Sequence, residues 1–552
     1  MEVKINSGAD LAKEVNSLAS SWTVRTAAIK KWYNMIRLVD DLKQDKMESV
    51  ISSDPRTSFN MASWLLTPKT PVFAVDTEGM NEAEISSVGA IEAYCNREYL
   101  KEQRRTASSL YGRFDKRLVN YMLATGWYSI ISHPTPDGWI WGVWNPTSVY
   151  PEYDQDGGLV KVARRYRIPA RHAAAKISAE GWQAPNRKWT SGQLNVYTEW
   201  WMDWDAELQE NVAWFCAGIG TELVRPPTST PFRAIPVHVA PVAGLPDDGS
   251  ITQDDSWRAE IGNSLVVPIL DIQKNYNRML SYMQQLIRDT ANPRWVEKVR
   301  GSSVLDPDKL FERGAVFTIE PGEEIFHLAT PPLPAEMRTH EFDLRNQIQR
   351  GSFSDLTFGN VTQQVSAMLV TQVTASAQQI LNPFQLGVMA AFSRIAAFNI
   401  AHMRAWGMEL SGASFPKLPD LLTIDFKYDV AIPGDFVNRA NISRILNPEF
   451  RLSAATLMEL LIPEVRNAVI EKGNLQAEDA LNNPIARAVL SIWQLQLAAR
   501  EARNNNDEQL ASMLERAAAL MEGQTFGAQK PAATTPGVPG APDIQALLGG
   551  SL

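Results

Sequence analysis

The chain has 552 residues, of which 45% are hydrophobic and 21% are charged, and this composition is typical of a folded globular protein rather than a disordered one. Its two cysteines, Cys95 and Cys216, lie far apart, which excludes a disulfide framework and a multi-cysteine zinc site. With 53 basic and 62 acidic side chains the net charge is −9, so the surface as a whole does not have the positive charge that binds nucleic acid tightly and without sequence preference.

The sequence shows no sign of export or membrane insertion. No positively charged segment followed by an apolar run opens the chain, so we expect no signal peptide. The most apolar helix-like stretch, Gly387–Met403, is interrupted by Arg394, Asn399 and His402. It therefore falls short of the ~18 apolar residues that a membrane span needs, and we expect a soluble cytoplasmic protein.

The first 125 residues are predicted to be mostly helical. Charged and apolar residues recur at helical spacing in Lys30–Leu42 and Glu82–Thr125, and Asp54–Thr57 between them is predicted to be a loop. Residues 127–240 hold ten of the 17 tryptophans. Short β-rich runs, such as Trp139–Trp144 and Leu159–Ile168, are separated there by turn residues, so we predict a β-rich domain.

A long amphipathic helix is predicted after Ser264, which would cap it, and Asn292–Pro293 would end it. Apolar residues alternate at four- and three-residue steps and form a heptad seam about 35 Å long; its central members are Ile269, Ile272, Tyr276, Met279 and Met283. The pattern fits a helix buried in its own core as well as one in a bundle between subunits. Lys274 and Arg278 lie outside the seam and are read either as a solvated face or as weak contacts to DNA.

A small α/β insert is predicted between this helix and the next one. Val316–Ile319 and Ile325–Leu328 would form a hairpin around Glu320–Glu323, where Pro321 and Gly322 fit the two central positions of a type II turn. Helical spacing returns at Ala335–Arg350. We therefore expect an antiparallel helix pair with the insert at its far end.

The remaining chain reads as a loop with exposed aromatic residues at Gly351–Gly359, and then a long helix over Thr362–Gly407 with a kink at Pro383. A short strand is predicted at Leu422–Tyr428, and an Ala- and Leu-rich helical region at Phe436–Glu522. A Pro- and Gly-rich tail follows from Gly523.

Catalytic motifs are missing from the sequence. It contains no phosphate-binding Gly-x-x-x-x-Gly-Lys-Ser/Thr loop, no His-Glu-x-x-His, no Gly-x-Ser-x-Gly and no Cys-x-x-Cys, and its six histidines are scattered, so we expect neither an enzyme nor a cofactor. One enzymatic alternative stays open. Glu199, Asp203 and Asp205 lie beside Trp200, Trp201 and Trp204, as in a carbohydrate-active enzyme with paired carboxylates, although large aromatic residues also fill ordinary cores.

Several stretches in this order carry a resemblance to a known family. They are Val149–Asp154 with the following Gly-Gly-Leu-Val, Ile235–His238, Gly262–Asn277 and the Asn292–Pro293 stop. Together with the helix–insert–helix–loop–kinked-helix order, they make nearly the whole chain resemble the portal proteins of tailed bacteriophages, most closely a short-tailed type. Another virion structural protein is a further alternative.

The resemblance implies an α+β, mainly α portal fold with wing, stem, clip and crown. The implied parts are residues 1–262 as the wing (helical, then tryptophan-rich β), 263–292 as the first stem helix, 293–334 as the clip, 335–350 as the second stem helix, 351–361 as the channel loop, 362–435 as the wing spine helix with its closing strand, 436–522 as the crown and 523–552 as the tail. The implied channel-loop residues are Ser352, Phe353, Ser354, Asp355, Phe358, Gly359 and Asn360.

The resemblance also implies a function and partners. A homo-dodecameric ring at one capsid vertex of the virion, assembled in the host cytoplasm, would nucleate head assembly and pass double-stranded DNA during packaging and ejection. Its expected partners are the major capsid protein, the scaffolding protein, the large terminase subunit and the head-to-tail adaptor, with no membrane. Glu320, Glu323 and Glu324 would serve docking at the clip, and Lys274, Arg278, Arg345 and Arg350 would touch DNA transiently.

Overall fold

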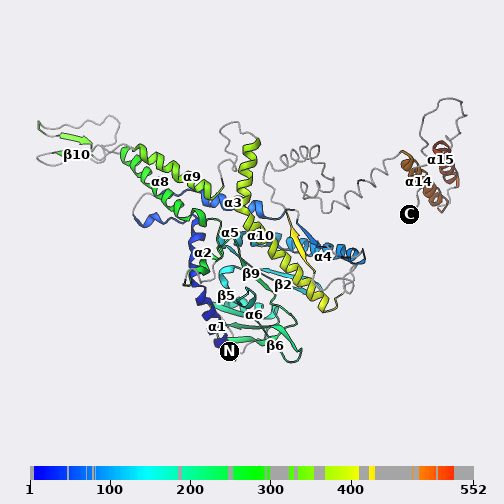
Figure 1. Ribbon diagram of the computed structural model, residues 1–552, viewed down its shortest axis with the longest axis horizontal. Coiled ribbons are helices and arrows are strands. Elements are labelled where there is room, and N and C mark those ends of the chain that lie inside the picture. The colour runs from blue at the N-terminus through cyan, green and yellow to red at the C-terminus, as the bar shows by residue number, and fades with distance from the viewer. Residues whose placement is uncertain are drawn as a thin grey trace, which may run out of the picture. The chain divides into compact units, whose positions relative to one another are not determined.

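The structure is a computed structural model that describes residues 5–45, 49–69, 71–77, 80, 82–184, 189, 191–246, 253–291, 295–298, 321–322, 324–327, 334–353, 367–408, 422–428, 475, 484–504 and 508–526. It is a mixed α+β structure, about 54% helix, with several small antiparallel sheets. This confirms the predicted mainly helical α+β class. The chain divides into two compact units, Met1–Ile442 and Ser443–Leu552, and each is described by itself (Figure 1).

The first unit begins with helices, as predicted. They are α1 (Gly8–Ser21), α2 (Thr23–Ile36), the 3-10 turn η1 (Leu42–Asp45), α3 (Asp54–Leu66), α4 (Glu82–Ala107) and α5 (Phe114–Thr125). The predicted loop at Asp54–Thr57 was wrong, because these residues form the first turn of α3. Pro55 lies at a position whose N–H has no partner within a helix, and Asp54 places a negative charge at the positive end of the helix dipole.

Two antiparallel sheets make up the tryptophan-rich region and confirm its β-rich prediction. The three-stranded sheet has the order β3-β2-β9, and the five-stranded sheet runs β4-β5-β6-β7-β8. Their bounds are β2 (Trp127–Thr135), β3 (Gly138–Val143), β4 (Val149–Tyr153), β5 (Leu159–Pro169), β6 (Gln193–Asp205), β7 (Glu210–Ile219), β8 (Glu222–Ser229) and β9 (Val237–Pro241), with η2 (Pro146–Ser148), α6 (Ala170–Ala179) and α7 (Trp257–Glu260) between them.

A buried arginine joins the helices to these sheets. The guanidinium of Arg25 lies 4.4 Å from the ring centre of Trp22 and 4.8 Å from that of Trp127. Its Nη2 donates hydrogen bonds to the carbonyl oxygens of Pro146 and Val149, at 3.3 and 2.6 Å. Burial lowers the pKa of Arg25 to about 10, but the group keeps its charge because two indole faces and two carbonyls replace its water.

The helix–insert–helix region follows the sheets. It comprises η3 (Val267–Ile269), α8 (Leu270–Ala291), β10 (Trp295–Lys298), β11 (Glu324–His327) and α9 (Ala335–Gly351). Helix α8 begins later than predicted, because residues 267–269 form the 3-10 turn η3 instead of α-helix. The Ser264 hydroxyl donates to the carbonyl of Leu123 at the end of α5 and accepts only a long hydrogen bond, 3.5 Å, from the Val266 N–H. Strand β11 pairs with β10, while the predicted partner Val316–Ile319 lies outside the described residues. Gly322 has φ +97°, which suits the predicted type II turn.

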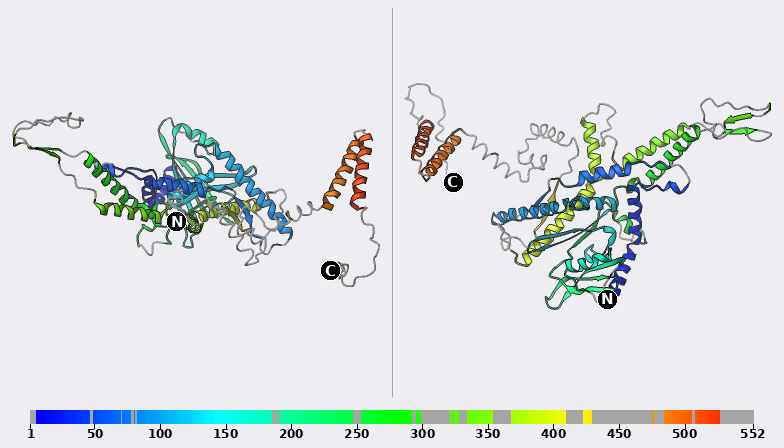
Figure 2. Two further views of the ribbon diagram at one scale, coloured as in Figure 1. Left: turned by 90° about the horizontal axis from the view of Figure 1, so that it is seen from above. Right: turned by 180° about the vertical axis from the view of Figure 1, so that it is seen from behind.

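Helix α10 (Ala367–Ala405) contains Pro383 and changes direction along its length in Figures 1 and 2. Strand β12 (Ile424–Lys427), predicted from the sequence, pairs with β1 (Val72–Val75). Within the described residues one segment, 377–405 of α10, is long and apolar enough to cross a membrane, contrary to our expectation that no stretch would be. Leu381, Phe392 and Ile400 of this helix are buried in the largest hydrophobic cluster of the unit, so core packing accounts for its composition.

In the second unit the structure describes α14 (Pro484–Asn504) and α15 (Glu508–Phe526). Small buried residues, among them Ala499, Ala502, Ala511 and Ala518, lie between the two helices, and Arg503 pairs with Glu515 at 2.8 Å. These helices confirm the helical prediction up to Glu522, but the tail was predicted to begin at Gly523 and α15 continues to Phe526. Apart from Leu475, the rest of Phe436–Glu522 lies outside the described residues, as does the chain beyond Phe526.

Candidate functional site

The candidate site is built on α8 and α9, which lie side by side in both figures. Tyr276 Oη donates to Glu341 Oε1 at 3.2 Å, and nearer the start of α8, Ile269 shares a buried cluster with Leu344 and Ile348 of α9. Later residues of α8 therefore lie beside earlier residues of α9. The pair is antiparallel.

The heptad seam is buried at the start of α8 and half-buried further along, where apolar residues flanking it are exposed. Ile269 and Tyr276 are buried, and Ile272 and Met279 pack on the same cluster, which also holds Ile29, Trp32 and Ile36 of α2. Met283 is half-buried. Further along the pair, Tyr282, Ile287 and Phe342 are 49%, 54% and 61% exposed, so apolar surface without a cover in this chain increases toward the end that bears β10 and β11.

The four basic candidates are not gathered in one place: two line one hollow, one lines another, and Arg350 lines neither. Lys274 and Arg278 are exposed, four residues apart on one face of α8, and they line a cavity against α2. Arg345 lines a second hollow, and Arg350 is exposed at the end of α9. Lys274 Nζ lies 3.8 Å from Asp271 Oδ1, a separation at which an exposed ion pair holds its lysine only weakly.

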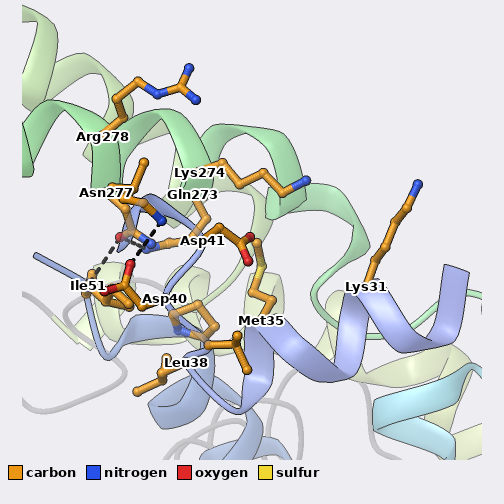
Figure 3. A pocket seen from close by; sticks show the side chains of 14 residues that line it. Lys31, Met35, Leu38, Asp40, Asp41, Ile51, Gln273, Lys274, Asn277 and Arg278 are labelled. Atoms are coloured by element: carbon orange, nitrogen blue, oxygen red, sulfur yellow. Dashed lines mark hydrogen bonds between the residues drawn. The ribbon is translucent and has the colours of Figure 1, made fainter. Parts of the chain in front are cut away.

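Figure 3 shows the first of these hollows, a cavity of about 110 Å³ between α8 and the end of α2 with the loop that follows it. Lys31, Lys274 and Arg278 extend outward from it, and Asp41 lies beneath Lys274. Asp40 is already engaged, because it accepts hydrogen bonds from the Ser49 hydroxyl and from the backbone N–H groups of Leu42 and Lys43, and these bonds lower its pKa.

A buried amide forms part of this cavity's wall. Gln273 is fully buried, and its Nε2 donates to Asn277 Oδ1 at 3.1 Å. Its Oε1 has no hydrogen-bond partner among the described residues. Sequence reasoning missed Lys31, Asp40 and Asp41, because only packing against α8 brings α2 and the loop after it beside Lys274, and it missed Gln273 because its burial depends on that packing. The cavity is lined by three cations, Lys31, Lys274 and Arg278, and by two carboxylates, Asp40 and Asp41, so its small positive excess suits weak contact with an anion at the rim rather than a dedicated anion site.

The second hollow, of about 250 Å³, lies where α9 enters the predicted channel loop. Ser52, Asp54, Tyr276, Arg345, Ser352 and Phe353 are among the residues that line it. Burial, together with the neighbouring Glu341, raises the pKa of Tyr276 to about 12, so its hydroxyl stays protonated and able to donate.

The first two channel-loop residues are anchored. Ser352 and Phe353 are buried, and the Ser352 hydroxyl donates to the carbonyl of Ile348 at 2.9 Å. The expectation that the loop exposes its aromatic residues was therefore wrong for Phe353, because its ring joins the main core cluster. The other channel-loop candidates, Ser354, Asp355, Phe358, Gly359 and Asn360, lie outside the described residues.

The predicted clip is described only at its two short strands and the turn beside one of them. Glu324 is exposed, and its carboxylate lies 3.5 Å from Lys298 Nζ across the β10–β11 pair. This ion pair is surface-exposed, so it contributes little to stability and leaves the carboxylate accessible to a partner. Glu320 and Glu323 lie outside the described residues.

The three carboxylates of the enzymatic alternative have different surroundings. Glu199 is completely buried beside Lys161, whose Nζ lies 2.7 Å from Glu199 Oε1 and 2.8 Å from Glu14 Oε1. Burial raises the pKa of Glu199, although Lys161 opposes the shift. Asp205 accepts hydrogen bonds from Ser229 and from the backbone of its own turn, which lower its pKa. Of these three only Asp203 is exposed, so Glu199, Asp203 and Asp205 do not form a pair of accessible carboxylates.

Other reactive groups are isolated in the part of the chain that the structure describes. No group of three or more His, Cys, Asp or Glu side chains there could hold a metal ion. Burial raises the pKa of both Cys95 and Cys216, so neither thiol is activated as a nucleophile. In comparisons with known proteins, no family model matches the chain and no curated protein matches it.

Proposed function

We propose that this chain is the subunit of a tailed-phage portal, a non-enzymatic ring at one capsid vertex that gives passage to double-stranded DNA. The observation that carries the proposal is the antiparallel α8–α9 pair, which is interrupted by the β10–β11 excursion and followed by the long, proline-bent α10. In this proposal α8 and α9 are the stem, β10 and β11 belong to the clip, and α14 and α15 belong to the crown.

The uncovered apolar residues of the stem support assembly into a ring. Tyr282 and Ile287 on α8 and Phe342 on α9 are each about half exposed or more. Exposed aromatic and aliphatic side chains in an apolar patch are typical of protein–protein interfaces. Neighbouring copies would cover these residues, which flank the outer end of the heptad seam on α8 or face it from α9, in the ring.

The charge distribution supports passage of DNA rather than tight binding. Lys31, Lys274 and Arg278 are exposed around one small cavity, in a chain whose net charge is −9. Each lysine or arginine that neutralises a phosphate adds affinity by releasing a counterion. A few cations in a negatively charged subunit would therefore contact a phosphate without holding the DNA in place.

The native mass of the purified protein, with particle images from the same peak, tests the proposal. Twelve copies of 61.5 kDa predict about 740 kDa and a ring with an axial hole. We expect Phe342→Glu to reduce the ring population, and Gln347→Glu, an exposed change on the same helix, to leave it intact. If the wild type forms a ring and the Phe342→Glu variant forms it to the same extent as the Gln347→Glu variant, the stem interface is rejected. A monomer in the presence of scaffolding and capsid proteins would reject the portal.

Two deletions test the assigned parts. Removing residues 302–331 should leave rings that fail to bind terminase, and normal packaging by such rings would show that the clip assignment is wrong. Removing residues 352–359 should impair packaging or retention of DNA while the ring persists.

The carbohydrate-active alternative predicts glycan hydrolysis that Glu199→Gln and Asp203→Asn abolish. The Glu199–Lys161 pair argues against it, because the Glu199 carboxylate is already held by the Lys161 ammonium at 2.7 Å and is not free to act as a general acid or nucleophile. Another virion structural protein would lack the ring.

A further inference from the structure

The five-stranded sheet has one face that α1 covers only in part. Leu11 and Val15 of α1 pack in the same cluster as the sheet, and Glu14 on the same helix meets Lys161 of β5. The uncovered part of this face forms an open hollow of about 1260 Å³ that Ile5 and Asn6 border and that extends to the β6–β7 turn at residues 205–207.

The floor of the hollow is a row of residues from all five strands. The strand registers pair Glu152 with Lys161, Lys161 with Trp201, Trp201 with Trp214 and Trp214 with Ser229. Residues directly opposite each other in a sheet share a face. The two indoles therefore lie side by side, with ring centres 6.3 Å apart and planes 21° apart.

Carboxylates surround these indoles. The hollow is lined by five acidic residues and by Lys161 as its one basic residue, counting only the described part of the chain; the acidic residues are Glu152, Glu199, Asp203, Asp205 and Glu207. Lys161 is already shared between Glu14 and Glu199. The hollow therefore keeps an excess of negative charge next to exposed aromatic surface, which includes Trp204 at 56% exposure.

A buried acceptor in the wall marks this hollow as more than an acidic patch. Glu199 is completely buried, and its Oε2 has no hydrogen-bond partner among the described residues. A buried carboxylate oxygen without a donor costs free energy that a cationic donor in the hollow would recover.

We propose that this hollow is a docking site for an arginine-bearing segment of a partner protein. A guanidinium is planar and weakly hydrated, so it stacks on an indole while its N–H groups donate to carboxylates. A neutral ligand such as a sugar would gain nothing from the excess negative charge. The inference does not depend on the ring, because every residue of the hollow belongs to one subunit.

The probe is a fluorescently labelled decapeptide of alternating arginine and serine, titrated against the full chain and followed by anisotropy. The matched control peptide carries citrulline, which keeps the shape of arginine without its charge. We expect the arginine peptide to bind and the citrulline peptide to bind at least tenfold more weakly.

Variants locate the binding. The double change Glu152→Gln with Asp203→Asn should weaken the arginine peptide about tenfold, since each exposed charge pair contributes a factor of about three. Asp137→Asn, an exposed aspartate in the β2–β3 turn of the other sheet, should change nothing. No binding of the arginine peptide at millimolar concentration would overturn the proposal. So would equal binding of the two peptides, or equal binding by the double variant when its thermal unfolding matches that of the wild type.

Discussion

Replacing Lys161 with methionine tests how the buried Glu199 carboxylate is held in the five-stranded sheet. Methionine keeps most of the length and apolar volume of lysine but leaves Glu199, which is completely buried, without the ammonium group at 2.7 Å. Removing one partner of a buried ion pair typically costs about 3–5 kcal/mol. Because Lys161 itself is 18% exposed, we expect the lower end, about 3 kcal/mol.

Cys216 provides a local assay for this loss. Its thiol is buried, lies opposite Glu199 in the β6–β7 register and belongs to the hydrophobic cluster of the five-stranded sheet. Labelling of the native protein with a thiol reagent, resolved by peptide mass spectrometry, therefore reports opening of this sheet. A loss of about 3 kcal/mol corresponds to roughly 150-fold faster labelling when opening is in rapid equilibrium. Cys95 lies in the other large cluster and should label at its wild-type rate.

The pH dependence and a second substitution complete the test. Burial raises the pKa of Glu199, so the folded state takes up its proton more readily than the unfolded state, and this contribution to stability is lost as the pH rises through the folded-state pKa. Without Lys161 the pKa rises further, and the deficit should be smaller at pH 5 than at pH 8. Adding Glu199→Gln should recover most of the loss. Less than fivefold faster labelling, or no recovery in the double variant, would refute the reasoning.

Three further outcomes are expected. Gly126→Ala should destabilise the first unit by more than about 2 kcal/mol in thermal unfolding, because Gly126 has φ +68° and a Cβ there would meet the backbone of residues 262–263 at 2.4 Å. Gly220→Ala is the control: Gly220 has φ +63° but lies in open space, so the change should cost only about 1 kcal/mol. Burial lowers the pKa of His238 to about 3. On acidification the unfolded state therefore takes up the proton first, and stability falls as the pH drops below about 6.5. His238→Leu should reduce this loss, measured as the difference between the thermal unfolding temperatures at pH 7 and pH 5. Leu344→Ala should cost about 2–4 kcal/mol and raise amide hydrogen exchange along α9, whereas the exposed Gln347→Ala should leave both unchanged; equal exchange in the two variants would show that α9 does not depend on α8.

Helices α8 and α9 were predictable from the sequence because their signals are local. A heptad seam and a proline stop determine α8, and helical spacing determines α9 within one residue of its observed end. The start of α8 was missed because residues 267–269 form a 3-10 turn instead of α-helix. The Ser264 hydroxyl bonds to the carbonyl of Leu123, and no local pattern shows that partner.

Contacts between distant segments account for the rest of what the sequence could not show. The five-strand row through Trp201 and Trp214 depends on four strand registers, and a shift of one residue in any of them would send those side chains to opposite faces. The position of Arg25 is another case. An arginine at helical spacing is expected in solvent, and only the two indoles and two carbonyls from later segments explain why it is buried. The cavity of Figure 3 was missed for the same reason, since α2 and α8 are far apart in sequence.

The chain leaves the rest of the first unit at η3 and returns to it at the end of α9, and these two points are in contact. A Cβ on Gly351 would lie 2.7 Å from the Ile269 side chain, so the chain between them leaves and returns at neighbouring points. The inner part of α8 packs on the rest of the unit as far as Ser281: Met279 and Leu280 contact the cluster shared with α2, and the Val50 N–H donates to Ser281 Oγ at 2.9 Å. On α9 the buried contacts begin at Leu344. The outer portion, from the end of α8 through β10 and β11 to the start of α9, can therefore be lengthened, shortened or replaced while the rest of the first unit keeps its hydrophobic core.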